Sequence, residues 1–122
     1  MVREFNFEDL EVWQKAVDFA DEVIGVTEVL QSSRNHFRLV EQLEAAATSV
    51  AMNIAEGKGR FSKKEFVHFL YIARGSLFET VTLLRIFERR GWADKEQLAR
   101  LSLKAAELAK MLNGLINSIK AN

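Results

Sequence analysis

The chain contains no cysteine and no proline, and only six of its 122 residues are glycine. The absence of cysteine excludes a disulfide scaffold, a thiolate-ligated zinc site and a cysteine nucleophile. Because proline and glycine are the usual helix breakers, long helices meet few interruptions in this sequence. No apolar run approaches the roughly 18 residues that span a bilayer, and we find no secretory signal, so we expect a cytoplasmic protein without a membrane partner.

The apolar residues, which make up 48% of the chain, recur at steps of three and four residues in four stretches. These stretches predict helices over about residues 7–30, 36–56, 63–90 and 95–120. The connections are short, so sequential helices must lie antiparallel. No repeat or linker divides the chain. The sequence therefore predicts one all-α domain over residues 1–122, an antiparallel up-down-up-down four-helix bundle.

Each predicted helix has an apolar face that we expect to form the core. The first face consists of Leu10, Trp13, Val17, Ala20 and Ile24, with Ala16, Phe19 and Val23 beside it. The other faces consist of Leu39, Leu43, Ala46, Val50 and Ile54; of Phe66, Phe69, Leu70, Ala73, Leu77, Val81 and Leu84; and of Leu98, Leu101, Ala105, Leu108, Leu112, Leu115 and Ile119. We expect Phe78, Phe87 and Trp92 to be a surplus that one bundle core does not absorb.

The third helix has the strongest start signal in the sequence. Ser62 and Glu65 fit a capping box, in which the Ser62 hydroxyl accepts from the Glu65 amide and the Glu65 carboxylate reaches back. Phe61 and Phe66 occupy the two positions of a hydrophobic staple. Candidate caps for the other helices are Ser33 or Asn35 for the second and Asp94, with Gln97 three residues later, for the fourth.

Glycines and polar residues near the helix ends form a predicted structural set. Gly57 and Gly59 are expected to end the second helix in the left-handed conformation, and Gly91 stops the third. We interpret Asn53 and Glu56 as partners for backbone amides at the helix junction. Mid-helix Gly75 costs about 1 kcal/mol relative to alanine, so we expect a close backbone beside it, at residues 45–47. The set is completed by Ser62, Glu65, Ser76 and Glu79.

The net charge of zero conceals an asymmetry between segments. Residues 1–30 contain two basic and eight acidic residues, a net charge of −6. Residues 61–92 contain six basic and three acidic residues, a net charge of +3. The acidic first helix could therefore complement a basic face on a neighbouring subunit.

The basic residues have two interpretations. In one, Lys58, Arg60, Lys63 and Lys64 form a corner that contacts phosphates beside a helix N-terminus. In the other they are solvated side chains around a helix junction, and the cations at the end of the third helix simply complement its dipole. The candidate nucleic-acid-binding residues are Lys58, Arg60, Lys63, Lys64, Arg74, Arg85, Arg89 and Arg90.

The sequence gives no support for a catalytic, metal or cofactor site. A di-metal centre in a helical bundle uses two Glu-x-x-His pairs, whereas this chain has only Glu65 with His68, and its other histidine is His36. No nucleophile elbow is present. The run Gly57-Lys58-Gly59-Arg60 lacks the preceding strand and the ending of a phosphate-binding loop. We therefore expect a protein that is not an enzyme and that carries no cofactor.

Two stretches carry a family resemblance. They are Phe7-Glu8-Asp9-Leu10-Glu11-Val12-Trp13-Gln14-Lys15-Ala16 and a central series of Asn53-Ile54-Ala55-Glu56-Gly57, Gly59-Arg60, Ser62, Glu65-Phe66, Phe69-Leu70, Ile72-Ala73, Gly75-Ser76-Leu77 and Glu79. From about Phe5 to Trp92 the chain resembles the bacterial 23S ribosomal RNA intervening-sequence proteins, also called S23-type four-helix-bundle proteins. The fourth helix agrees with that family in pattern only.

The resemblance implies ring-shaped homopentamers of antiparallel four-helix protomers, and it brings no catalytic residue. A related branch serves diversity-generating retroelements as an accessory protein, in which a basic pentamer partners a reverse transcriptase and nucleic acid. This chain departs from the family at Glu44 and Ala45, where arginines are common. The departure weakens the transfer of a nucleic-acid role.

Two functions follow as hypotheses. The first is a non-enzymatic, oligomeric accessory protein that associates with RNA or DNA. The second is a structural or protein-partner scaffold, such as a reverse-transcriptase accessory subunit. The two are compatible, because a ring multiplies weak phosphate contacts by avidity.

Overall fold

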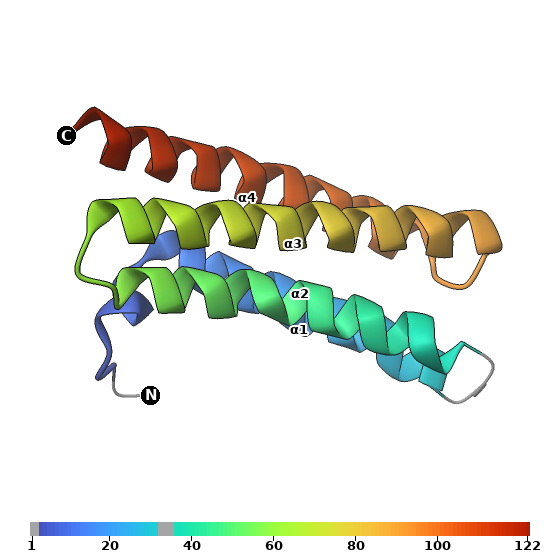
Figure 1. Cartoon of the computed structure of the whole chain (residues 1–122). Coiled ribbons are helices and arrows are strands. Elements are labelled where there is room, and N and C mark those ends of the chain that lie inside the picture. The colour runs from blue at the N-terminus through green and yellow to red at the C-terminus, as the bar shows by residue number, and fades with distance from the viewer. Residues whose placement is uncertain (1–2, 32–35) are drawn as a thin grey trace.

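The computed structural model describes residues 3–31 and 36–122, and in these residues the chain forms four long helices preceded by one short 3-10 helix (Figure 1). The elements are η1 (Asn6–Asp9), α1 (Glu11–Gln31), α2 (Phe37–Lys58), α3 (Lys63–Arg90) and α4 (Lys95–Ala121). Successive helices run in opposite directions, and each packs against two neighbours. The contact between α2 and α3 is the most extensive and that between α1 and α4 the least. The predicted antiparallel four-helix bundle is thus confirmed.

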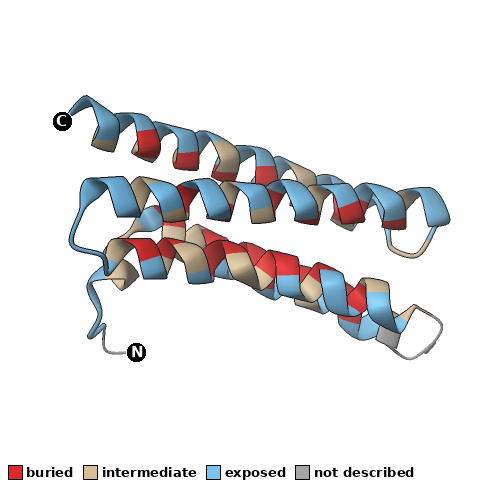
Figure 2. Ribbon diagram, in the orientation of Figure 1, coloured by how far each residue is buried: buried red, intermediate tan, exposed pale blue. Residues whose placement is uncertain are grey.

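The core lies where the four helices turn their apolar faces toward one another (Figure 2). The predicted faces of α2, α3 and α4 are largely confirmed, since their central residues are buried. The largest fully buried side chains are Phe19, Phe87, Leu43, Ile54, Leu70, Leu77, Leu84, Leu98, Leu101, Leu108 and Leu112. The expectation for Phe87 was wrong, because its ring is fully buried, and Trp92 packs partly buried against the core. Of the three aromatics expected on the surface, Phe78 alone is there, with 53% of its area exposed.

The first helix is rotated relative to the predicted orientation. Val12, Phe19, Val23 and Val26 are buried, whereas Val17, which we predicted to be in the core, is 38% exposed. The helix carries two overlapping apolar stripes, and the one that contains the phenylalanine ring faces the core because it buries the larger apolar area. The second stripe is left at the surface beside α2.

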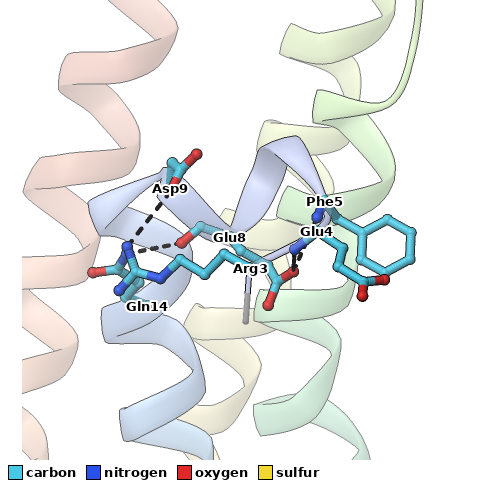
Figure 3. Close-up of polar contacts among 6 residues, drawn as sticks. All are labelled: Arg3, Glu4, Phe5, Glu8, Asp9 and Gln14. Carbon is cyan, nitrogen blue, oxygen red and sulfur yellow. Dashed lines mark hydrogen bonds and ion pairs between the residues drawn. The ribbon is translucent and has the colours of Figure 1, made fainter. Parts of the chain in front are cut away.

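The first helix also begins later than predicted, at Glu11 rather than near residue 7. The preceding residues form η1, where the Glu8 carboxylate accepts from the main-chain N–H groups of Glu4 and Phe5, both at 3.1 Å (Figure 3). Leu10 then adopts an extended conformation. The Gln14 side chain donates to the Glu8 main-chain oxygen at 2.8 Å and so ties η1 to α1 (Figure 3).

One of the two hydrogen bonds of the predicted capping box is present at the start of α3. The Ser62 hydroxyl accepts from the Glu65 N–H at 3.1 Å, which confirms the cap. Within the described ranges the Glu65 carboxylate does not accept the second hydrogen bond of the box, which would come from the Ser62 main-chain N–H. The predicted staple was wrong: Phe61 is completely exposed, because the connection turns its ring into solvent and away from Phe66. The Asp94 cap is confirmed, whereas Ser33 and Asn35 lie outside the described residues.

The glycines act differently from the prediction, except at one position. Gly91 ends α3 in the left-handed conformation, with φ of 70°. Gly57 lies within α2 and Gly59 caps that helix at φ of −80°, so the predicted left-handed termination was wrong at both. The close backbone predicted beside Gly75 was wrong as well, since no atom of the described residues lies within 4 Å of a Cβ atom built there. A close neighbour is found instead at Gly57, where α3 packs directly against α2.

Candidate nucleic-acid interface

A row of cations runs along one side of α3. Lys63, Arg74 and Arg85 are separated by eleven residues, which is close to three helical turns, so all three lie on one face. At a rise of about 1.5 Å per residue, the row is about 33 Å long. All three were among the candidates identified from the sequence. The periodicity that puts them in line is a property of the helix alone.

Each cation of this row donates a hydrogen bond to an oxygen of α4 or of the residue that follows it, and the acceptors of the two arginines are neutral side-chain oxygens. The three bonds are Lys63 Nζ to the Asn122 main-chain oxygen at 2.9 Å, Arg74 Nη1 to Asn113 Oδ1 at 2.8 Å and Arg85 Nη1 to Ser102 Oγ at 2.7 Å. Neutral acceptors hold the side chains in place but do not cancel their charge. In the described part of the chain no carboxylate forms an ion pair with any of the three. Arg74 and Arg85 therefore present ordered positive charge that no described residue neutralises.

Two aromatic rings lie between the cations of the row. Tyr71 is 38% exposed and Phe78 is 53% exposed, one turn before and one turn after Arg74. The Arg74 guanidinium lies 4.9 Å from the Tyr71 ring centroid and 5.9 Å from that of Phe78. Lys120 of α4 donates to the Tyr71 hydroxyl at 3.3 Å and adds a further positive charge. We call Lys63, Tyr71, Arg74, Phe78 and Arg85 the basic–aromatic stripe.

The sequence analysis missed Tyr71 and Lys120. The signal for the tyrosine was available, because an aromatic residue three positions before an arginine lies on the same face of a helix. The sequence contains no comparable signal for Lys120, because this residue reaches the stripe only through the packing of α4 on α3.

An open groove of about 400 Å³ adjoins the stripe between α3 and α4. Phe78 and Arg85 form part of its wall, and its remaining lining is mostly small or apolar. Those other lining residues are Leu77, Val81, Thr82, Ser102, Ala105, Ala106 and Ala109. The groove has the size of a small-ligand site and places apolar surface directly beside a guanidinium.

The other basic candidates do not join the stripe. Their ring contacts are Lys58 with Phe66 at 5.8 Å, Arg60 with Phe69 at 4.8 Å and Arg90 with Trp92 at 5.8 Å, each measured to the ring centroid. Arg60 is also neutralised by Glu56, whose carboxylate lies 2.5 Å away. Lys64 and Arg89 are exposed, and neither has a partner within residues 3–31 and 36–122. The predicted corner is thus dispersed, because its members turn toward different neighbours.

The remaining members of the structural set lie mainly between α2 and α3. The Ser49 and Ser76 hydroxyls are 2.9 Å apart, and the Asn53 side chain donates to the Ser49 hydroxyl and main-chain oxygen, both at 2.8 Å. Asn53 and Glu56 were predicted to pair with backbone amides, which was wrong: one donates to a carbonyl and the other pairs with Arg60. Glu79 is exposed.

The side of the bundle formed by α1 and α4 is held by opposite charges. Lys15 Nζ lies 2.7 Å from Glu107 Oε1, and Lys104 pairs with Glu22. The hydrogen bond from Lys15, and then its charge, lowers the pKa of Glu107, while the same bond and the Glu107 charge raise the pKa of Lys15. The acids of α1 are thus partly paired within the chain, whereas in the described residues no acid forms an ion pair with a cation of α3.

At Glu44, where the resembling family commonly has arginine, this chain uses the carboxylate internally. The hydroxyl of the buried Thr27 on α1 donates to Glu44 Oε2 at 2.7 Å. The neighbouring Ala45 is exposed and adds no charge. The α2 surface therefore does not extend the positive surface of α3.

A second open groove, of about 470 Å³, lies between α1 and α2. It is lined by Trp13, Val17 and Ile24 of α1 and by Met52 of α2, which is 66% exposed. Asp21 is the one charged residue in its lining. This α1–α2 groove is formed by the apolar stripe of α1 that does not enter the core.

Among the described residues, no group of three or more potential metal-ligating side chains gathers in one place. In the same part of the chain, no helix has both the length and the apolar character needed to cross a membrane. The features that stand out are therefore the basic–aromatic stripe with its groove and the α1–α2 groove.

Comparisons with known proteins agree with this fold. The chain is similar to a crystal structure of a protein of unknown function from the S23 ribosomal protein family of Bacteroides thetaiotaomicron, with a TM-score of 0.82 and 26% sequence identity over 86% of this chain and 97% of that one. Among curated proteins, none matches the sequence. The model of the 23S rRNA-intervening sequence protein family matches residues 8–114, and so reaches well into α4, further than the resemblance in the sequence indicated. The chain belongs to the 23S rRNA-intervening sequence protein family.

Proposed function

We propose that this chain is a non-enzymatic, nucleic-acid-associated protein that contacts phosphates through the basic–aromatic stripe. The observation that carries the proposal is the pair Arg74 and Arg85 of that row, whose guanidinium groups donate to neutral side-chain oxygens of α4 and, in the described residues, form no ion pair. Cations that are already ordered lose little side-chain entropy when they bind phosphate.

The expected strength of this association is modest for a single protomer. Three phosphate contacts give a slope of log affinity against log salt of about −2.7 for duplex and about −2.1 for single strands. Raising the salt from about 50 to about 200 mM should then weaken binding to duplex about 40-fold. An oligomer would strengthen binding by presenting several stripes at once.

The test is fluorescence anisotropy of the full chain with labelled RNA and DNA of mixed sequence over that range of salt. We expect the double variant Arg74→Gln and Arg85→Gln to reduce the salt slope and the affinity. The matched control is Arg100→Gln, which removes an exposed cation of α4 that is not part of the stripe. The proposal is refuted if the unaltered protein binds no nucleic acid at low salt. It is also refuted if the double variant and the control lose the same affinity per charge removed.

A second function, self-assembly into a scaffold, is favoured by the α1–α2 groove. Exposed apolar surface of this kind marks interaction sites, and Met52 contributes a large side chain that the protomer leaves in solvent. The groove lies on the most acidic part of the chain, residues 1–30, and the most basic part lies elsewhere on the surface. Complementary charges on different faces favour a heterologous contact, which closes into a ring when its rotation allows.

For this second function the expected assembly is a homopentamer, and the measurement is light scattering after size-exclusion chromatography. Met52→Glu should lower the mass of the assembly by adding a charge to the groove. Leu103→Glu is the control, because Leu103 is 73% exposed on α4 and lines neither groove. A monomer at micromolar concentration in the unaltered protein would contradict assembly.

A further inference from the structure

We infer that the basic–aromatic stripe binds single-stranded nucleic acid in preference to duplex, an inference that rests on the proposed function and names its substrate class. Phosphate contacts alone do not distinguish the two forms, because both carry a charged backbone. The distinction comes from groups that contact the faces of bases. In a duplex those faces are stacked on one another, and in a single strand they are free to stack on a protein.

The stripe contains such groups. Phe78 is 53% exposed and Tyr71 is 38% exposed, and the two rings flank the Arg74 guanidinium. A guanidinium plane is itself a surface on which a base stacks. Lys120 hydrogen-bonds to the Tyr71 hydroxyl and keeps a cation beside that ring. The alternation of ring and cation along one helix face is the arrangement used by proteins that bind single strands without reading their sequence.

The groove between α3 and α4 provides a place for a base beside the stripe. Phe78 and Arg85 of α3 both line it, together with alanines 105, 106 and 109 of α4. An apolar floor that adjoins an aromatic ring fits the face of a nucleobase. It does not fit the phosphate-rich outer surface of a duplex. Arg74 and Arg85, about 16 Å apart along α3, would then contact phosphates of the strand at separate nucleotides, above and below the inserted base.

Few specific donors and acceptors line the groove, so base identity should matter little. Thr82 and Ser102 are its uncharged hydrogen-bonding side chains, and Ser102 already accepts from Arg85 and donates to the Leu98 main-chain oxygen. We therefore expect single strands of different sequence to bind with similar affinity, with stacking and charge as the common contributions.

The experiment compares a fluorescein-labelled 20-nucleotide single strand of mixed sequence with the same strand annealed to its complement, in both DNA and RNA, at about 50 mM salt. We expect the single strand to bind at least about tenfold more tightly. Phe78→Ala should weaken single-strand binding by about five- to 100-fold and leave duplex binding nearly unchanged, because the stacking surface is lost and the charge is kept. The slope of log affinity against log salt should be the same for Phe78→Ala as for the unaltered protein.

Matched variants separate stacking from charge and from folding. Ile72→Ala removes apolar surface of similar exposure, 39%, from a part of α3 outside the stripe and should change neither affinity. Tyr71→Leu removes the second ring and should act in the same direction as Phe78→Ala. Circular dichroism of each variant confirms that the bundle is intact, which is expected because both rings are largely outside the core.

The outcomes distinguish this inference from the proposed function. If the unaltered protein binds neither form, the proposed function fails. If it binds both forms equally and Phe78→Ala changes neither, the proposed function stands and the single-strand inference is overturned. If Phe78→Ala weakens both forms equally and also lowers the mass measured by light scattering, the ring belongs to a contact between copies, and the inference is again overturned.

Discussion

Gly57 of α2 packs directly against Phe69 of α3, so closely that a Cβ atom at position 57 would lie 2.8 Å from the Phe69 Cβ. The same atom would lie 3.0 Å from a ring carbon of Phe66 and 3.2 Å from the Phe66 main-chain oxygen. The two helices with the most extensive contact therefore approach at a position that admits no side chain. The sequence indicated a helix end at this glycine, and α2 does end one residue later, at Lys58; the structure adds that α2 and α3 are in direct contact there.

Gly57→Ala should destabilise the protein by about 1 to 3 kcal/mol, because the added methyl group must displace α3 from α2. Gly75→Ala is the matched control, since its Cβ would meet nothing within 4 Å. That substitution should stabilise the protein by up to about 1 kcal/mol through the higher helix propensity of alanine. Urea denaturation at one fixed protein concentration measures the free energy of unfolding of both variants. An equal change in the two would contradict the close contact of α2 with α3 at Gly57.

The orientation of α1 is tested by truncating one residue from each of its apolar stripes. Phe19→Ala should lower the free energy of unfolding by about 3 to 5 kcal/mol, because the fully buried ring leaves a cavity. Val17→Ala should cost less than about 1 kcal/mol, since this side chain is already partly in solvent. Chemical denaturation followed by circular dichroism measures the free energy of unfolding of both variants. A larger loss in Val17→Ala than in Phe19→Ala would mean that the predicted core stripe was correct.

The start of α3 provides a contrast between two adjacent residues. Ser62→Ala should cost about 1 kcal/mol, because the Glu65 N–H loses its hydroxyl acceptor. Phe61→Ala should change stability by less than about 0.5 kcal/mol, since the Phe61 ring is completely exposed. Thermal unfolding of the two variants is sufficient for the comparison. A substantial loss in Phe61→Ala would show that a staple forms after all.

The Lys15–Glu107 pair predicts a defined pH dependence of stability. Because the folded-state pKa of Glu107 lies below its ordinary value of 4.5, its contribution is present above that value and is lost as the pH falls through the lower, folded-state pKa. Because the pKa of Lys15 lies above 10.5, its contribution is present below that value and is lost as the pH rises through the higher one. The pair therefore stabilises the fold between these two limits.

The measurement is the melting temperature against pH for the unaltered protein and for Glu107→Gln. The difference between them should be constant across the neutral range and should shrink on acidification below about 4.5. Glu41→Gln serves as the control, because Glu41 is an exposed carboxylate of α2 without an ion pair in the described ranges. A difference for Glu107→Gln that does not vary with acid pH would exclude the ion pair as its origin.

Several features that depend on contacts within one helical turn were predictable. The caps at Ser62 and Asp94 and the left-handed end at Gly91 involve atoms no more than a few residues apart, and all three are confirmed. Two local predictions failed, the return bond of the Glu65 carboxylate and the left-handed end of α2, and the other failures depend on neighbours from other helices or on the path of a connection. The solvent-exposed ring of Phe61 and the crowded Cβ position at Gly57 are of this kind.

The candidate site likewise combines features that the sequence predicts with features that depend on the packing of the helices. The positions of Lys63, Arg74 and Arg85 on one face of α3 follow from their eleven-residue spacing. Their hydrogen-bond partners do not follow from the spacing, because those come from α4 and its end, up to 59 residues away. Without these partners, it could not be known that the charges of Arg74 and Arg85 have no acidic partner in the described residues while charges of α1 are partly paired.

The sequence by itself determined that the chain forms four antiparallel helices, because apolar periodicity, caps and short connections act locally. Only the tertiary structure decided which stripe of α1 enters the core and which cations of α3 keep an unneutralised charge. The physical reason is that burial and ion pairing depend on which side chains meet across helices. Phe19 and Val17 lie two positions apart, and the packing of the bundle buries one and leaves the other in the α1–α2 groove.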